Sequence, residues 1–339
     1  MKILYYVTDH GLGHASRTVA IIRELKKKNI QIIVRNNDPF EFFKKSLPGI
    51  QIISGDTDFQ PVMSKKNDML FNESKTKANL SNWIHQMPML IKKESTIIKK
   101  IKPNVIISDI SFMPILAASK NKIKSILVSS FIWNESLKIP NNMKQYIKNS
   151  YKNADIILRL SLGTPVNLQN VHKMGVVARH STLSRKQIRK NLKIKPNEKL
   201  ILFSLSRKEK IQLKHSKNIK ILDVSDYSII KKSGITNLVE GQNLITAADL
   251  VICKCGYGFI SECLTSKTKF LYVVESKHIE SNSIHKELEK LGLKNRISVK
   301  RLVNTIFDDQ FIESAMVTNV PFDNQNVAKK IIEIADRVI

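Results

Sequence analysis

Short apolar segments that alternate with amphipathic helical segments are the feature that most restricts the fold of this chain. Residues 2–8 form an apolar run, residues 16–28 have helical periodicity, and residues 30–35 form a second apolar run. A strand, a helix and a second strand in this order make a βαβ unit. The alternation continues through the apolar runs 105–108 and 125–129. Because parallel strands joined in this way carry helices on both faces, the pattern predicts an α/β fold with a buried parallel sheet.

A second series of strands and helices begins after the polar, basic segment 180–199. The length of 339 residues suits two globular domains of about 150 residues each. We predict two tandem doubly wound, Rossmann-like domains over residues 1–178 and 179–323, and a last helix over 324–339 that packs on either of them. Ligands of such open sheets bind at the carboxyl ends of the strands, so the domains are expected to face an interdomain cleft. The elements expected in the second domain are strands at 200–205, 219–223, 237–239, 250–253 and 269–274, and helices at 258–266, 282–291 and 299–307.

The chain is strongly basic, with 56 lysines and arginines against 29 aspartates and glutamates and a formal net charge of +27. Such an excess favours anionic partners: nucleotide phosphates, an anionic membrane surface or nucleic acid. The lysines are spread along the whole chain, which fits a general lysine bias equally well and disfavours a specific reader of nucleic acid. The runs 26–28 and 92–102 motivate a peripheral contact with anionic lipid, although a solvated helix face explains them as well.

The cysteines and the apolar segments bear on the cellular compartment. Cys253, Cys255 and Cys263 lie within eleven residues, and no second group of metal ligands accompanies them. This spacing predicts buried, reduced thiols and no metal site. The first apolar run is too short for a signal peptide, and no run approaches the roughly 18 apolar residues of a membrane span. We expect a cytoplasmic protein that at most touches the inner face of a membrane.

The loop after the first strand has the sequence DHGLGHASR. Gly11 and Gly13 allow a tight turn and a close approach of the backbone to a ligand, and the helix amino end offers N–H groups to an oxyanion. Arg17 adds a cation for an acceptor or a phosphate. The loop is not a dinucleotide fingerprint, because Ser16 replaces the third glycine, and it is not a P-loop. The alternative is a structural turn in which Ser16 caps the helix.

Two further residues of this region suit acid–base chemistry. His14 lies in the first helical turn, and the ordinary pKa of histidine is close to neutral, as a general base requires. Asp109 ends an apolar strand at the ligand side of the sheet. A carboxylate in that position orients an imidazole and stabilises its protonated form. The structural alternatives are a helix turn around His14 and a helix cap formed by Asp109.

A third region, KCGYGFISE, follows an apolar strand in the second half of the chain. Lys254, Gly256 and Gly258 precede or open a helix, and this combination of glycines, a helix amino end and a lysine suits a diphosphate. Ser261 and Glu262 lie one turn into that helix, where Glu262 can accept hydrogen bonds from two ribose hydroxyls. This region is the strongest local indication of nucleotide binding.

Together the two loops resemble those of the GT-B glycosyltransferases, in particular the branch of the lipid-linked N-acetylglucosaminyl transferase of peptidoglycan synthesis and its archaeal relatives. Gly11–His14 matches the G-x-G-H loop of that branch. Residues 254–262 have the frame of the plant glycosyltransferase signature, with Gly256 on its Gly, Tyr257 on its Trp and Glu262 on its ribose-binding Glu. Lys254 stands where those enzymes place a phosphate-contacting His.

The resemblance implies that the first domain binds an acceptor and the second a nucleotide-sugar, commonly a UDP-sugar. It further implies an inverting transferase in which His14 deprotonates the acceptor hydroxyl and Asp109 orients His14. Such enzymes work without a metal or a separate cofactor, because helix amino ends and basic side chains stabilise the departing diphosphate. The acceptor stays open, with lipid-linked alcohols among the candidates.

Two positions depart from the pattern of the family. Its glycine-rich loop after the first strand of the second domain is here FSLSR, in which Ser206 and Arg207 are left to contact the donor through their side chains. Its sugar-contacting acid–Gln pair is here Glu280 followed by Ser281. Two other functions therefore stay open: a sugar-nucleotide hydrolase on the same fold, and a binding protein for nucleotide-sugars or nucleic acid that has lost turnover.

Overall fold

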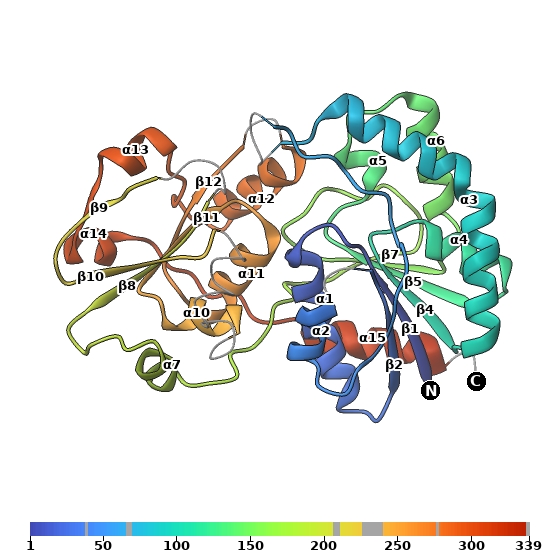
Figure 1. The fold of residues 1–339 in the computed structure, drawn as a ribbon, viewed down its shortest axis with the longest axis horizontal. Coiled ribbons are helices and arrows are strands. Elements are labelled where there is room, and N and C mark those ends of the chain that lie inside the picture. Colours follow the sequence, from blue (N-terminus) through green and yellow to red (C-terminus); the bar gives the residue numbers. More distant parts are fainter. Residues whose placement is uncertain (38–39, 66–69, 206–210, 226–239, 276–277, 337–339) are drawn as a thin grey trace. The chain divides into compact units, whose positions relative to one another are not determined.

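The chain folds into two compact units. The computed structural model describes residues 1–37, 40–65, 70–205, 211–225, 240–275 and 278–336. The first unit comprises Met1–Lys65, Phe71–Val177 and Phe322–Ile339, and the second comprises Lys66–Leu70 and Ala178–Pro321. Each of them contains a parallel sheet with helices (Figure 1). The predicted α/β class is therefore confirmed.

The first unit contains, in its described part, a seven-stranded parallel sheet in the order β3-β2-β1-β4-β5-β6-β7. The strands are β1 (Lys2–Val7), β2 (Gln31–Arg35), β3 (Gln51–Ile53), β4 (Val105–Asp109), β5 (Lys124–Ser129), β6 (Ile156–Arg159) and β7 (Val171–Lys173). β1 pairs with β2 on one side and with β4 on the other, with Leu4 beside Ile106 and Val7 beside Asp109. The order of the strands reverses between β1 and β4, so the carboxyl ends of these two strands form the topological switch point, where open α/β sheets bind ligands.

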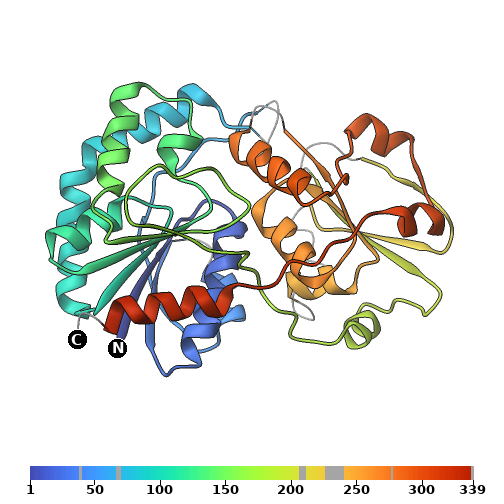
Figure 2. The ribbon, with the colours of Figure 1, turned by 180° about the vertical axis from the view of Figure 1, so that it is seen from behind.

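Helices cover both faces of this sheet. They are α1 (Leu12–Lys26), α2 (Phe40–Ser46), α3 (Glu73–Ile101), α4 (Met113–Lys120), α5 (Trp133–Ser136), α6 (Asn141–Tyr151) and α15 (Asn324–Asp336). α3 packs against α4, and Ile98 of α3 shares an apolar cluster with Leu4 and Tyr6 of β1. α15 packs against α1, so the last described helix belongs to the first unit (Figure 2). Because β1 is buried from Ile3 to Val7, its end is held rigidly at the switch point.

The second unit has a four-stranded parallel sheet in the order β10-β8-β11-β12 and a two-stranded sheet β13-β9, counted over its described residues. The strands are β8 (Lys199–Ser204), β9 (Lys214–His215), β10 (Ile219–Asp223), β11 (Leu250–Lys254), β12 (Phe270–Val273) and β13 (Ile306–Phe307). The helices are α7 (Arg185–Asn191), α10 (Gly241–Ala247), α11 (Tyr257–Ser266), α12 (Ile279–Lys290), α13 (Val299–Asn304) and α14 (Asp309–Ser314). Its switch point lies between β8 and β11.

The structure differs from the sequence prediction at several short elements. The helix expected over 299–307 ends at Asn304, because the next residues leave it to pair as β13 with β9. β6 and β7 were not predicted, and the strand expected at 237–239 lies outside the described residues.

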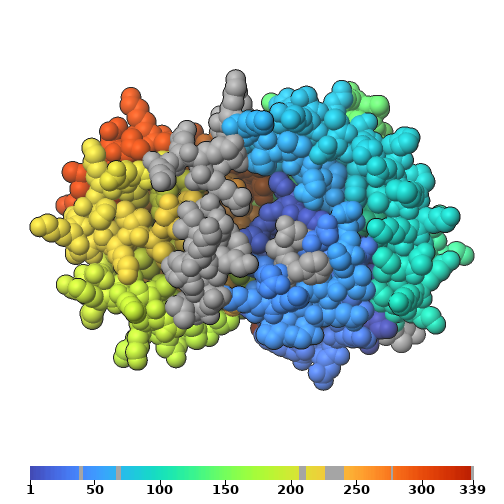
Figure 3. All heavy atoms as spheres, viewed as in Figure 1, coloured from blue at the N-terminus to red at the C-terminus, as the bar shows by residue number. Residues whose placement is uncertain are grey.

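Exposed lysines gather on α3, whose atoms form part of the surface drawn in cyan in Figure 3. Lys92, Lys93, Lys99 and Lys100 are exposed, whereas Glu94 on the same helix is buried and bonded to Arg35. The outer face of the second half of α3 is therefore basic.

Candidate active site

The loop between β1 and α1 brings His14 to the switch point of the first unit. Gly11 precedes the helix with φ 79°, a left-handed conformation that glycine adopts without strain. α1 then begins at Leu12, so that His14 lies in its first turn, with Gly13 partly exposed beside it. Leu12 is 38% exposed, which leaves the beginning of α1 open to a ligand.

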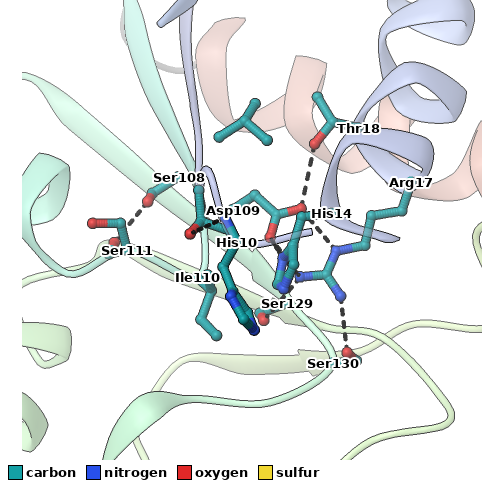
Figure 4. A network of polar contacts seen from close by, with 12 residues as sticks. His10, His14, Arg17, Thr18, Ser108, Asp109, Ile110, Ser111, Ser129 and Ser130 are labelled. Carbon is teal, nitrogen blue, oxygen red and sulfur yellow. Dashed lines mark hydrogen bonds and ion pairs between the residues drawn. The ribbon is translucent and has the colours of Figure 1, made fainter. Parts of the chain in front are cut away.

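His14 and Asp109 form a buried pair across the two central strands. Nδ1 of His14 lies 2.6 Å from Oδ1 of Asp109 (Figure 4). The His14 side chain keeps 9% of its surface exposed, whereas Asp109 keeps none. The imidazole is therefore the member of the pair that a substrate can touch, and the carboxylate supports it from inside the protein.

Arg17 completes this network from the next turn of α1. Its Nε donates to Oδ2 of Asp109 at 2.7 Å, and its Nη1 donates to the hydroxyl of Ser130 at 2.9 Å. Thr18 adds a weaker hydrogen bond to Oδ2 at 3.3 Å. Arg17 was expected to face an acceptor or a phosphate, but the structure places it inside the unit with a relative exposure of 2%. Its guanidinium holds Asp109, because a buried carboxylate requires a cation or several donors.

The charges of the network fix its protonation. Burial raises the pKa of Asp109, but the charge of Arg17 and the interactions with His14, together with the hydrogen bonds from both, outweigh burial and lower this pKa to about 2. Burial and the neighbouring Arg17 lower the pKa of His14, against the opposing effect of Asp109. At neutral pH the pair therefore consists of a carboxylate and a neutral imidazole.

The tautomer of His14 follows from its neighbours. Nη2 of Arg17 lies 2.6 Å from the same Nδ1 that contacts Asp109, and one ring nitrogen cannot both donate to Asp109 and accept from Arg17. Nη2 of Arg17 already donates to Oδ1 of Asp109, so we assign the proton to Nδ1 of His14 as the donor to Asp109. Nε2 then carries a free lone pair, and it has no hydrogen-bond partner among the described residues. This is the tautomer of a general base.

The loops around this pair contain a second buried carboxyl group. Asp58 is 2% exposed and accepts a hydrogen bond from Nε1 of Trp133 at 2.9 Å. Burial raises the pKa of Asp58 to about 8, despite that hydrogen bond and others from Thr8 and the backbone of Phe59. Trp133 is itself fully buried, so it is part of the core and offers no open stacking surface.

In the second unit, the predicted diphosphate loop lies at the carboxyl end of β11. Lys254 is the last residue of that strand and is exposed. Gly256 directly precedes α11, and Gly258 lies in its first turn, both partly exposed. These residues suit an anion, because the first N–H groups of a helix lack partners within the helix.

The remaining predicted residues of α11 are buried. Tyr257 is 4% exposed, and Ser261, at 1%, donates its hydroxyl to the carbonyl of Gly258. Oε1 of Glu262 accepts a hydrogen bond from Nε of Arg179 at 2.7 Å, in an ion pair that is almost fully buried. Arg179 was not predicted, because 83 residues separate it from Glu262 and no local pattern links them.

The donor residues expected after β8 and β12 are placed only in part. Ser206 and Arg207 lie outside the described residues. Glu280 lies in the first turn of α12 and is partly exposed. His278 precedes α12 and accepts a hydrogen bond from the backbone N–H of Ser281, and burial and the charge of Lys254 lower its pKa to about 4. Lys254 is therefore close enough to His278, the residue before α12, for its charge to act on that imidazole.

Within the described ranges, no three His, Cys, Asp or Glu residues are grouped so that they could hold a metal ion. Cys253, Cys255 and Cys263 are free and buried, and burial raises the pKa of each thiol. No helix in the described part of the chain is long and apolar enough to cross a membrane.

Comparisons with known proteins give a family match and a distant relative of this chain. A family model described as "Glycosyl transferase family 1" matches residues 1–305. The L-arabinokinase of Arabidopsis thaliana is 23% identical over an alignment of 297 positions, which covers 79% of this chain and 28% of that protein. The chain thus spans little more than a quarter of the length of this relative.

Solved structures show the same fold. The glycosyltransferase SnogD from Streptomyces nogalater has a TM-score of 0.62 and 11% identity, and the match covers 99% of each chain. The glycosyltransferase VinC in complex with DTDP has a TM-score of 0.60 and 9% identity, over 99% of this chain and 100% of that one. The glycotransferase of kitacinnamycin has a TM-score of 0.58 and 14% identity, over 99% and 92%. These similarities confirm the predicted two-domain Rossmann-like fold.

Proposed function

Because this chain belongs to glycosyl transferase family 1, and is therefore a glycosyltransferase with the GT-B fold, we propose that it moves a sugar from a nucleotide-sugar to an acceptor hydroxyl with inversion. The observation that carries the proposal is the buried pair of His14 and Asp109 at the switch point of the first unit. Its neutral imidazole has a free Nε2, as deprotonation of an alcohol requires.

In the proposed reaction, Nε2 of His14 takes the proton of the acceptor hydroxyl. The acceptor oxygen forms a bond to the anomeric carbon while the bond from that carbon to the diphosphate breaks, and the electron pair leaves with the diphosphate. A single displacement of this kind inverts the anomeric centre. Asp109 stabilises the imidazolium that forms, because it stays ionised beside it.

We assign donor binding to the second unit. Lys254 and the amino end of α11 would neutralise the diphosphate, and the site would thus need no metal. The structural neighbour VinC was solved with DTDP, which supports a nucleoside diphosphate as the leaving group. The resemblance of residues 254–262 to the plant signature supports a UDP-sugar. EDTA should accordingly leave turnover unchanged.

On the acceptor side, we propose a lipid-linked alcohol at an anionic membrane surface. The G-x-G-H loop resembles that of the lipid-linked N-acetylglucosaminyl transferase, and the exposed lysines of α3 give the first unit a basic face. Flotation with vesicles that contain anionic lipid should show binding that salt removes. Absence of such binding would remove this part of the proposal.

The test of the main proposal is donor binding followed by turnover. Calorimetry should show that UDP or another nucleoside diphosphate binds the wild type and His14→Ala alike. Incubation with the corresponding nucleotide-sugar and a membrane lipid extract should then give a glycosylated product only with the wild type. Release of free sugar at the same rate without any acceptor would identify a hydrolase, and no nucleotide binding would refute the proposal.

A further inference from the structure

The backbone directly after Asp109 adopts a conformation that its sequence disfavours. Ile110 has φ 62°, in the left-handed region, although β-branched side chains are strained there. The strain is local: the carbonyl of Asp109 accepts the N–H of Ser111 at 2.9 Å and closes a tight turn around Ile110. A buried isoleucine keeps such a conformation only when surrounding contacts impose it.

The carbonyl of the strained residue is held by a hydrogen bond from α6. The hydroxyl of Tyr151, the last residue of that helix, donates to the carbonyl of Ile110 at 2.5 Å, and it accepts a weak hydrogen bond from the backbone N–H of Trp133 at 3.4 Å. Tyr151 and Ile110 both have no exposed surface. Water therefore cannot replace the hydroxyl, and the peptide between Ile110 and Ser111 depends on Tyr151 for its orientation.

A second set of hydrogen bonds closes the turn on its other side. The hydroxyl of Ser108 donates to the carbonyl of Ser111 at 2.6 Å, as Figure 4 shows, and the hydroxyl of Ser111 donates to the carbonyl of Thr57 at 2.5 Å. These bonds fix the end of the turn at Ser111. They do not reach the carbonyl of Ile110, so the serines cannot substitute for Tyr151.

We infer that Tyr151 is a positioning residue for the pair of His14 and Asp109. Its hydroxyl keeps Ile110 in the left-handed conformation, and this turn directs the carboxylate of Asp109 toward Nδ1 of His14. When the hydroxyl is removed, Ile110 relaxes to a negative φ, the peptide that follows Asp109 rotates, and the carboxylate loses its alignment with the imidazole. The inference concerns the geometry of the pair, and its consequence for catalysis rests on the proposed function.

The test reads the tautomer of His14 and needs no substrate. In protein with 15N-labelled histidine, two-bond 1H–15N spectra at neutral pH distinguish Nδ1–H from Nε2–H, and His14→Gln assigns the signal. The wild type should show the Nδ1–H tautomer, because Asp109 accepts that proton. Tyr151→Phe should shift the signal toward a mixture of tautomers. An unshifted signal in Tyr151→Phe would overturn the inference, as would a wild type in the Nε2–H form.

Tyr6→Phe is the matched control. Tyr6 is also fully buried and donates one side-chain hydrogen bond, to Glu94 of α3 at 2.9 Å, whereas Asp109 bonds to residues of α1. Both variants lose one buried hydroxyl, so both should lower the stability. Only Tyr151→Phe should change the tautomer of His14. An equal change in the two variants would assign the effect to general loosening of the unit and overturn the inference.

Ile110→Gly tests the role of strain. Glycine adopts a positive φ without cost, so the turn no longer depends on the hydroxyl of Tyr151. The variant is expected to be less stable, because a buried side chain is lost, but the tautomer of His14 should resemble that of the wild type. In the double variant Tyr151→Phe with Ile110→Gly, the Nδ1–H tautomer should return. A double variant that shows the same mixture as Tyr151→Phe would contradict the role of strain.

Discussion

The two proposed sites are built in opposite ways. In the first unit, Arg17 and Thr18 hold Asp109, and Asp109 holds His14, so that a buried network of hydrogen bonds presents one imidazole with a free Nε2. In the second unit, the groups offered to a diphosphate are an exposed lysine and backbone at a helix amino end, and the carboxylate of Glu262 is paired with Arg179. The difference suits their tasks, because a base must be fixed to within tenths of an ångström, whereas an anion is held by charge and N–H groups.

Replacement of His14 by alanine should have the largest effect, because it should reduce sugar transfer at the first site and leave nucleotide binding at the second site intact. Transfer should fall by about 10²–10⁴-fold, the usual contribution of a general base. Binding of a nucleoside diphosphate should change little, because His14 belongs to the acceptor side. Product formation and calorimetry on the same preparation measure both effects. A variant with full turnover would exclude His14 as the base.

Arg17→Met tests whether the first site depends on the buried ion pair between Arg17 and Asp109. Removal of one partner of a buried ion pair costs about 3–5 kcal/mol of unfolding free energy, because Asp109 keeps a buried charge without its cation. Urea unfolding measures the loss. Arg23→Met is the control on the same helix, since Arg23 is only partly buried and should cost far less. Equal losses in the two variants would contradict the structural role of Arg17.

Glu262→Gln examines the second site. Glutamine keeps an oxygen for Arg179 but removes the charge that strengthens a ribose hydrogen bond, so nucleotide affinity should fall by about 1.5–3 kcal/mol. Calorimetric titration with UDP gives the value. An unchanged affinity for UDP in a correctly folded Glu262→Gln variant would exclude Glu262 as a ribose ligand.

The contribution of the first site to the pH dependence of stability has a definite sign. The pKa of His14 is lowered in the folded protein, so the unfolded chain binds more protons below the ordinary value of 6.5. The stability contributed by His14 is therefore present above pH 6.5 and is lost as the pH falls through the lowered pKa. For Asp109, with a pKa of about 2, the loss continues between pH 4 and pH 2. Denaturant titrations from pH 7 to pH 3 on the wild type and His14→Gln isolate this decline as the difference between the two proteins, because Asp58 and His278, which also titrate in this range, contribute to both.

Lys254→Ala should have the smallest effect. An exposed lysine gives a modest, salt-screened attraction, so donor affinity should fall less than tenfold, and less at high salt. Titrations at two salt concentrations measure it. A loss as large as that of Glu262→Gln would show that the lysine is desolvated when the donor binds.

Much of the fold was predictable because it is encoded locally. The βαβ periodicity predicted β1, α1 and β2, and the polar ends of β1 and β4 marked the place of His14 and Asp109. Elements that depend on distant partners were not predictable: residues 306–307 continue a helical pattern but pair with β9.

The contacts within the sites were predictable only where the chain order indicates them. Arg17 lies one turn after His14 in the sequence. No local pattern shows that its guanidinium donates hydrogen bonds to Asp109, which follows 92 residues later. The pairing of Arg179 with Glu262 was hidden for the same reason. The left-handed turn at Ile110 runs against the preference of its residue type, so no propensity could reveal it.

The return of α15 to the first unit has a consequence for biosynthesis. α1, which carries His14, packs against a helix that the ribosome makes only after the whole second unit. At about 5–20 residues per second, the contact surface on α1 waits about 15–60 seconds for its partner. During that interval the nascent first unit exposes apolar surface, so its final closure is a late step of folding that a chaperone is well placed to protect.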